Sequence, residues 1–179
     1  MAETYSRDGS ALVIRFNSET IRIEAWGPDA LRVRARPGGD VVAPHVSALL
    51  DPVPISPEIE IDGRHARITN GRIRAEVRLA RRLGADVNTE PEITFRRADT
   101  GQELLAETRS HFAGPGPRSF KALASDSFEL EARFRAYSDE RLMGLGQPQH
   151  GLEDLKGTST TLVQQNTHVV IPFVLSSRG

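Results

Sequence analysis

The stretch Arg-Ile-Arg-Ala-Glu-Val-Arg-Leu, residues Arg72–Leu79, decides the fold class of this chain. Every second side chain in it is apolar, namely Ile73, Ala75, Val77 and Leu79. Side chains on a strand point to opposite faces in turn, so the pattern predicts a β-strand with one buried and one solvated face. Such alternation is typical of antiparallel sheets, because strands buried on both faces read as continuous apolar runs.

The same alternation recurs along the chain. It is strong in three further stretches: Ile21–Trp26, Leu31–Arg36 and Phe128–Ala136. It is weaker in seven others: Ala11–Phe16, Pro57–Ile61, His65–Asn70, Glu92–Arg97, Glu103–Glu107, Thr160–Gln165 and Val169–Ser176. We expect about ten to twelve short strands and little helix, which predicts an all-β fold, an antiparallel β-sandwich.

Turn residues separate the expected strands. Asp62-Gly63 and Asn70-Gly71 each stand between two strand patterns, and both dipeptides accept the positive φ angles of two-residue hairpin turns. The segment His111–Ser125 has no periodicity and is predicted to be a long loop.

Composition excludes several classes of protein. The chain has 179 residues, a net charge of −1 and no Cys. A disulfide scaffold, a Cys-ligated metal site and a thiol nucleophile are therefore excluded. The balanced charge gives no footprint for nucleic acid, and no apolar run reaches the ~20 residues that cross a membrane. No signal peptide is recognisable, so we expect a cytoplasmic protein.

Catalytic motifs are missing from the sequence. The five His show no metal-ligand spacing, so neither a metal nor a cofactor is expected. A glycosidase needs two carboxylates that face each other across a sugar. The adjacent acids Asp139-Glu140 and Glu153-Asp154 would point apart on an extended chain, which favours surface roles. Gly144–Gln147 lacks the Lys-Ser/Thr of a phosphate-binding loop and is read as a tight bend.

The last forty residues carry an ordered set of motifs. Asp-Glu-x-x-x-Gly-x-Gly-Gln begins at Asp139, and a Lys-Gly step follows at Lys156. An Asn-Thr step at Asn166 and Ile-Pro-Phe with a later Ser-x-x-Gly, from Ile171, complete the set. Together with Gly71–Val77 and the run from Ile93 to Glu107, this order resembles the N-terminal domain of glycoside hydrolase family 31, which includes α-glucosidases and α-xylosidases.

The resemblance implies a galactose-mutarotase-like β-sandwich and a parent enzyme that hydrolyses α-glycosidic bonds with retention. It places the two catalytic Asp of that enzyme on a (β/α)₈ barrel further along the chain. Nothing in these 179 residues alternates strand and helix as a barrel of ~250 residues would. We therefore expect residues 1–179 to be one N-terminal domain, incomplete at its C-terminus, without the barrel and inactive alone.

The resemblance also implies a substrate-binding loop. In the family, a loop of this domain helps to shape the leaving-group side of the sugar site, and its position maps between Gly157 and Ile171. Amides and hydroxyls suit hydrogen bonding to sugar hydroxyls. The candidate residues are Gln164, Gln165, Asn166, Thr167 and His168. Gln-Gln-Asn-Thr replaces the Asn-Arg-Asp of glucosidase-type members, which favours the xylosidase-like branch.

Other interpretations stay open at this point. The chain could be a freestanding carbohydrate-binding sandwich, or a structural or oligomerisation module in which residues 160–167 form a plain edge strand and loop. Mutarotase chemistry rests on fold analogy alone, since no His/Glu spacing supports it. The expected partners are a carbohydrate substrate, the downstream barrel and a second copy in a homo-oligomer, with no nucleic acid and no membrane.

Overall fold

The computed structural model describes residues 4–42, 50, 53–81, 88–109, 116–124, 127–147 and 149–179. Within these ranges the chain forms antiparallel strands and no helix. This part of the chain accordingly contains no helix long and apolar enough to span a membrane. The chain divides into two compact units, residues 1–135 and 136–179, each of which is described by itself.

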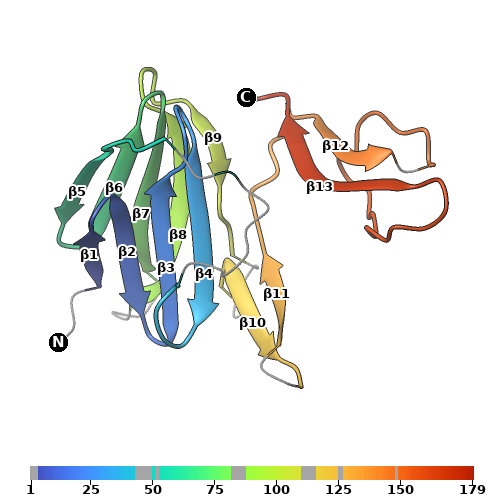
Figure 1. Ribbon diagram of the computed structural model, residues 1–179. Coiled ribbons are helices and arrows are strands. Elements are labelled where there is room, and N and C mark those ends of the chain that lie inside the picture. The colour runs from blue at the N-terminus through green and yellow to red at the C-terminus, as the bar shows by residue number, and fades with distance from the viewer. Residues whose placement is uncertain are drawn as a thin grey trace. The chain divides into compact units, whose positions relative to one another are not determined.

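Two antiparallel sheets make up most of the first unit, and Figure 1 shows them face to face. In each sheet the strands follow one another in chain order, so that neighbours in sequence are neighbours in space. Sheet A contains β1 (Tyr5–Asp8), β2 (Ala11–Phe16), β3 (Glu19–Ala25) and β4 (Leu31–Pro37). Sheet B contains β5 (Glu58–Asp62), β6 (His65–Asn70), β7 (Ile73–Arg81), β8 (Asn88–Arg97) and β9 (Glu103–Ala106).

The core lies between these sheets, as the alternation in the sequence predicts. Sheet A contributes Leu12, Ile14, Ile21 and Ile23, and sheet B contributes Ala66, Ile68, Ala75, Val77 and Ile93. Every second residue of a strand is buried because its neighbours point to the opposite face. The expected all-β, antiparallel β-sandwich is confirmed.

Polar contacts join the two sheets at their ends. Asn70 donates from its side-chain amide to the carbonyls of Gly27 and Ala30, at 2.8 and 2.7 Å. Asp29 accepts from the backbone N–H of Arg72 at 2.7 Å and from its guanidinium at 3.0 Å, and these two bonds to Arg72 lower the pKa of the Asp29 carboxyl. The β3–β4 and β6–β7 turns are thereby fastened together.

Two hairpins complete the structure. The β10–β11 hairpin (Arg118–Ala122 and Phe128–Ala132) belongs to the first unit, and an isolated bridge between Glu107 and Phe134 joins the chain after it to sheet B. The β12–β13 hairpin (Leu142–Gln147 and Val169–Ser176) belongs to the second unit.

Most predicted strands are confirmed, and each of their ends lies within four residues of the expected position. Three sequence expectations are wrong. Residues 160–165 form no strand, and the predicted long loop 111–125 contains strand β10 at residues 118–122, while residues 111–115 lie outside the described part. The expected buried face of Phe128–Ala136 is exposed at Phe128, Leu130 and Phe134, because no second layer covers the hairpin within the described residues.

Candidate functional site

The loop predicted to bind substrate forms a tight turn just before β13. The N–H of His168 donates to the carbonyl of Gln165 at 2.9 Å, which closes the turn. Asn166 has a φ angle of +46°, in the left-handed region that Asn tolerates better than most residues. Residues Gln164 to Thr167 are exposed, and His168 is half-buried.

Two of the five candidates are already engaged within the turn. The Gln164 amide donates to the carbonyl of His168 and accepts from the N–H of Val170 at 3.1 Å. The hydroxyl of Thr167 accepts from the side chain of Gln149. Both residues hold the turn to the chain around it, a role that the sequence does not reveal.

The other side chains project from the turn. Among the described residues, no side-chain hydrogen bond is recorded for Gln165, Asn166 or His168. Their amides and imidazole remain able to donate to and accept from a ligand. The five predicted residues therefore lie on one turn. The side chains of Gln164 and Thr167 stabilise it, whereas those of Gln165, Asn166 and His168 make no side-chain hydrogen bond among the described residues.

The strand opposite the turn is distorted at Gly144–Gly146. Gly144, Leu145 and Gly146 have φ angles of +113°, +63° and +90°, and the register of β12 against β13 shifts between the two Gly. A Cβ atom on Gly146 would lie 2.0 Å from the carbonyl oxygen of Val169. The Gly-rich motif therefore forms a β-bulge within β12, where a tight bend was expected from the sequence, and it lies against the start of β13.

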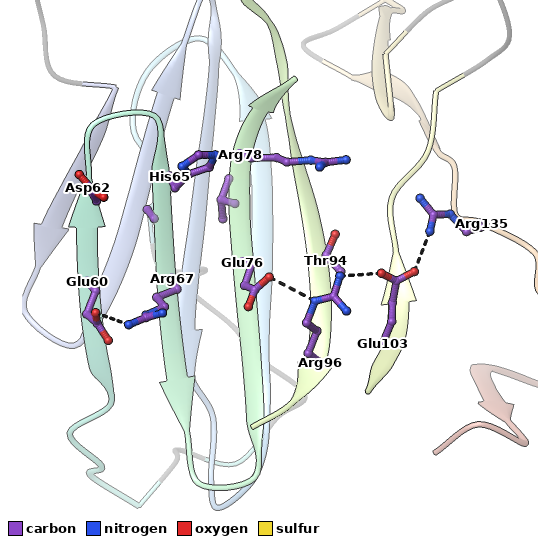
Figure 2. A pocket seen from close by; sticks show the side chains of 12 residues that line it. Glu60, Asp62, His65, Arg67, Glu76, Arg78, Thr94, Arg96, Glu103 and Arg135 are labelled. Atoms are coloured by element: carbon purple, nitrogen blue, oxygen red, sulfur yellow. Dashed lines mark hydrogen bonds and ion pairs between the residues drawn. The ribbon is translucent and has the colours of Figure 1, made fainter. Parts of the chain in front are cut away.

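A second polar feature, which the sequence did not single out, lies on the outer face of sheet B. A hollow of about 600 Å³ extends over strands β5 to β9, as Figure 2 shows. Its charged side chains form ion pairs along the sheet. Arg67 pairs with Glu60 at 2.5 Å, and Arg96 bridges Glu76 and Glu103 at 3.2 and 2.8 Å.

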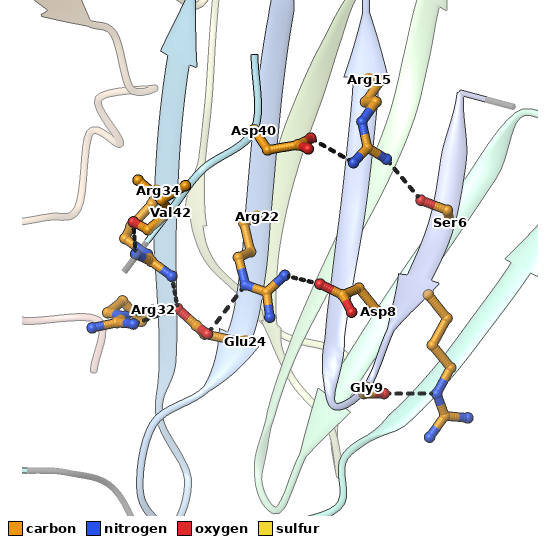
Figure 3. A network of polar contacts seen from close by, with 11 residues as sticks. Ser6, Asp8, Gly9, Arg15, Arg22, Glu24, Arg32, Arg34, Asp40 and Val42 are labelled. Carbon is orange, nitrogen blue, oxygen red and sulfur yellow. Dashed lines mark hydrogen bonds and ion pairs between the residues drawn. The ribbon is translucent and has the colours of Figure 1, made fainter. Parts of the chain in front are cut away.

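The outer face of sheet A carries a network centred on Glu24 (Figure 3). Arg22, Arg32 and Arg34 all pair with this carboxylate, at 3.4, 2.7 and 2.9 Å. Burial works to raise the pKa of Glu24, but the three guanidinium groups outweigh it and the pKa is lowered. Arg32 also stacks on Trp26, with its guanidinium carbon 3.4 Å from the ring centre, so it covers one face of that ring.

A buried ion cluster joins β3, β10 and the chain after β9. Arg118 pairs with Glu19 at 2.7 Å and with Glu107, and the Glu107 carboxylate also accepts from the N–H of Ile93 at 2.8 Å. The side chains of Arg118 and Glu107 are only 5% and 6% exposed. Burial raises the pKa of Glu107 in spite of the nearby guanidinium.

Among the described residues, no group of three or more His, Asp or Glu is arranged to hold a metal ion. The polar features of both units consist of hydrogen-bonding and ion-paired side chains.

The first unit is a two-layer antiparallel β-sandwich and the second contains the β12–β13 hairpin. No family model matches the chain. A protein of Pseudescherichia vulneris named as an uncharacterised family 31 glucosidase is 33% identical over 178 residues, which cover 95% of this chain and 33% of that protein. α-Xylosidase A of Aspergillus niger is 28% identical over 200 residues, covering 99% of this chain and 25% of that enzyme.

A solved structure of a family 31 enzyme has the same fold as this chain. The family 31 α-xylosidase from a soil metagenome, crystallised with xylose, superposes with a TM-score of 0.83 and 29% identity. The match covers 99% of this chain and 27% of that one. The resemblance to glycoside hydrolase family 31 is thus confirmed over nearly the whole chain, which spans about a third or less of the length of the relatives it matches.

Proposed function

We propose that this chain is the N-terminal accessory domain of a retaining α-glycosidase of the α-xylosidase type. In this proposal it packs on the catalytic barrel and lends the turn 164–168 to the aglycone subsite. The observation that carries the proposal is the coverage. Relatives named as glucosidase and xylosidases match 95–99% of this chain, yet the chain supplies only 25–33% of their length.

The turn supports the second part of the proposal. Its backbone is fixed by the Gln164 bridge and by the bond from His168 to Gln165. A fixed turn presents the amides of Gln165 and Asn166 without a large loss of conformational entropy on binding. Neutral amides also hydrogen-bond to sugar hydroxyls without the desolvation cost of a charge.

The first test concerns the chain alone. The purified 179-residue protein should not hydrolyse 4-nitrophenyl α-D-xylopyranoside or the corresponding α-glucoside, because it corresponds to only 25–33% of the length of the relatives named as glycosidases. The release of nitrophenol is followed at 405 nm over hours, with a family 31 α-xylosidase as the positive control. Turnover above the buffer blank, retained through a second purification, would sink the proposal.

The second test places the turn in an active enzyme. A chimaera carries this chain in place of the matching 27% of the soil-metagenome α-xylosidase. Asn166→Gly keeps the positive φ angle and removes the amide, whereas Ala would also strain the backbone. We expect KM to rise about threefold to tenfold for xylosides with a sugar leaving group, the loss of about one hydrogen bond, and little change for aryl xylosides.

The matched control is Ser159→Ala, an exposed residue of the same unit that lies outside the turn. Unchanged kinetics in both variants would reduce the domain to a packing or oligomerisation role. An equal loss with aryl and sugar leaving groups would argue against a contribution to the aglycone side.

A further inference from the structure

The hollow on sheet B is built from cross-strand rows of polar side chains. Asp62 of β5 lies opposite His65 of β6, which lies opposite Arg78 of β7. Two residues further along the strands, Glu60, Arg67 and Glu76 form a second row in the same register. Because inward-facing neighbours such as Ala66 and Val77 fill the core, these rows must face outward, as Figure 2 shows.

Ion pairs hold the side chains of the second row and of the neighbouring strands β8 and β9. Glu60 holds Arg67, and a chain of ion pairs runs from Glu76 through Arg96 to Glu103, which also pairs with Arg135 at 2.8 Å. Each guanidinium bonded to a carboxylate is restricted in rotation, so these paired side chains are largely ordered before a ligand binds.

The first row differs from the second, because its side chains are only weakly engaged. Among the described residues, the side chains of Asp62 and His65 form no hydrogen bond or ion pair within the protein, and Arg78 forms one long ion pair, with Glu92 at 3.7 Å. A carboxylate, an imidazole and a guanidinium therefore stand side by side with unused acceptors and donors. The hydroxyl of Thr94 on β8 adds a fourth group to the same hollow.

The balance of charge selects the type of ligand. Four carboxylates and four guanidinium groups line the hollow, so it favours neither an anion nor a cation. Its volume of about 600 Å³ falls within the ~300–1,000 Å³ range of small-molecule sites. A neutral molecule that both donates and accepts many hydrogen bonds matches this lining.

From this geometry we infer that the outer face of sheet B is a binding site for a neutral carbohydrate, held by Asp62, His65 and Arg78. Carbohydrate hydroxyls can pair with each of these groups in turn along the row. The inference does not depend on the accessory role proposed above, since the site lies entirely within the first unit.

The experiment is a titration of the ¹⁵N-labelled 179-residue chain with xylose, glucose and maltotriose, followed by amide chemical shifts. We expect saturable shifts concentrated in β5–β8 for at least one sugar. Arg78→Ala and His65→Ala should each weaken the apparent affinity tenfold or more. The matched control is Arg36→Ala, an exposed guanidinium on sheet A whose loss should change the affinity less than twofold.

Three results would overturn the inference: no saturable shift with a well-dispersed spectrum, shifts confined to residues 164–168, or equal affinities for Arg78→Ala and Arg36→Ala. Circular dichroism of each variant shows whether the sheets are intact. Where His65→Ala unfolds the protein, His65→Gln tests the same group with a smaller change. Failure here would leave the chimaera kinetics, and with them the proposed function, untouched.

Discussion

At the scale of single residues, the positions with the least freedom are the Gly of the β12 bulge. Gly146 combines a φ angle of +90° with carbonyl and amide atoms of β13 within 3 Å of where a Cβ would lie. Gly157, in the same unit, has a φ angle of +75° but open space around it. The two positions separate the cost of the backbone angle from the cost of crowding.

We expect Gly146→Ala to destabilise the second unit by about 2–6 kcal/mol, since strain and overpacking each contribute about 1–3 kcal/mol. Gly157→Ala should cost only about 1–2 kcal/mol, the penalty of the left-handed conformation. Both values are measured by denaturant unfolding followed through the amide signals of β13. Equal costs would mean that the bulge relaxes to accommodate the methyl group.

At the scale of elements, the buried Arg118 cluster fastens the β10–β11 hairpin to both sheets. Arg118 bonds Glu19 at the start of β3 and Glu107 just after β9, and it also donates to the carbonyl of Pro91 at 2.8 Å. Lys121 lies on the same strand and pairs with Glu129 in full contact with solvent. One strand thus carries a buried and an exposed ion pair.

Arg118→Ala should lower the free energy of unfolding by about 3–5 kcal/mol, because it leaves two carboxylates in a buried site without their cation. Lys121→Ala should lower it by less than about 1 kcal/mol, as is usual for exposed pairs. Urea unfolding at neutral pH gives both values. A loss below 1 kcal/mol for Arg118→Ala would show that water reaches the cluster.

The same cluster predicts a dependence on pH. Burial raises the pKa of Glu107 above its unfolded value, so the folded state binds a proton more tightly than the unfolded chain. The resulting stabilisation is fully present below the unfolded pKa and is lost as the pH rises through the folded one. Wild type should therefore gain stability relative to Glu107→Gln as the pH falls from 7 towards 4.5.

Thermal unfolding of both proteins at several pH values checks this expectation, because the difference between them removes the contribution of the other carboxylates. A difference that does not vary with pH, or that grows as the pH rises, would contradict it.

The elements also show how much of the fold the sequence determines. Strands with strong alternation, such as Arg72–Leu79, are found where they were predicted, because one face enters a core. Strand β10 was not predicted from the sequence, because its five residues include one large apolar side chain, Phe120. It is also held by the ion pair of Arg118 with Glu19, a residue far away in the sequence. Thr160–Gln165 has β-branched residues but no strand, since propensity yields to tertiary context.

The candidate sites were predictable to different degrees. The turn at 164–168 follows from the motif order, although the sequence does not show that Gln164 and Thr167 support the turn. The hollow on sheet B could not be predicted, because it depends on the register of strands that bring Asp62, His65 and Arg78 into one row.

At the scale of the whole molecule, the two units differ in how they are stabilised. The first encloses a core of fully buried side chains between two sheets. The second holds a single buried apolar residue among those described, Leu155, and exposes Ile171, Phe173 and Leu175 on β13. Stability is therefore expected to be uneven along the chain.

Hydrogen exchange should show this difference directly. Amides of β7 should exchange only through global unfolding, whereas those of β12 and β13 should exchange at least about a hundredfold faster through local opening, an energy gap of about 2.7 kcal/mol. Mass spectrometry of peptic peptides resolves the two units. Equal protection in both would mean that they unfold together.

Deamidation of Asn70 is expected to depend on how the first unit opens. An Asn followed by Gly is the sequence most prone to spontaneous deamidation, in which the N–H of Gly71 attacks the side-chain carbon. The amide of Asn70 cannot rotate into that position while it is held by the carbonyls of Gly27 and Ala30. The attack expels ammonia, and water then opens the resulting ring to a carboxylate, so each deamidation is irreversible. The amount of deamidated protein therefore records how often the two turns part, and the new carboxylate would be repelled by the two carbonyl oxygens that now accept from Asn70.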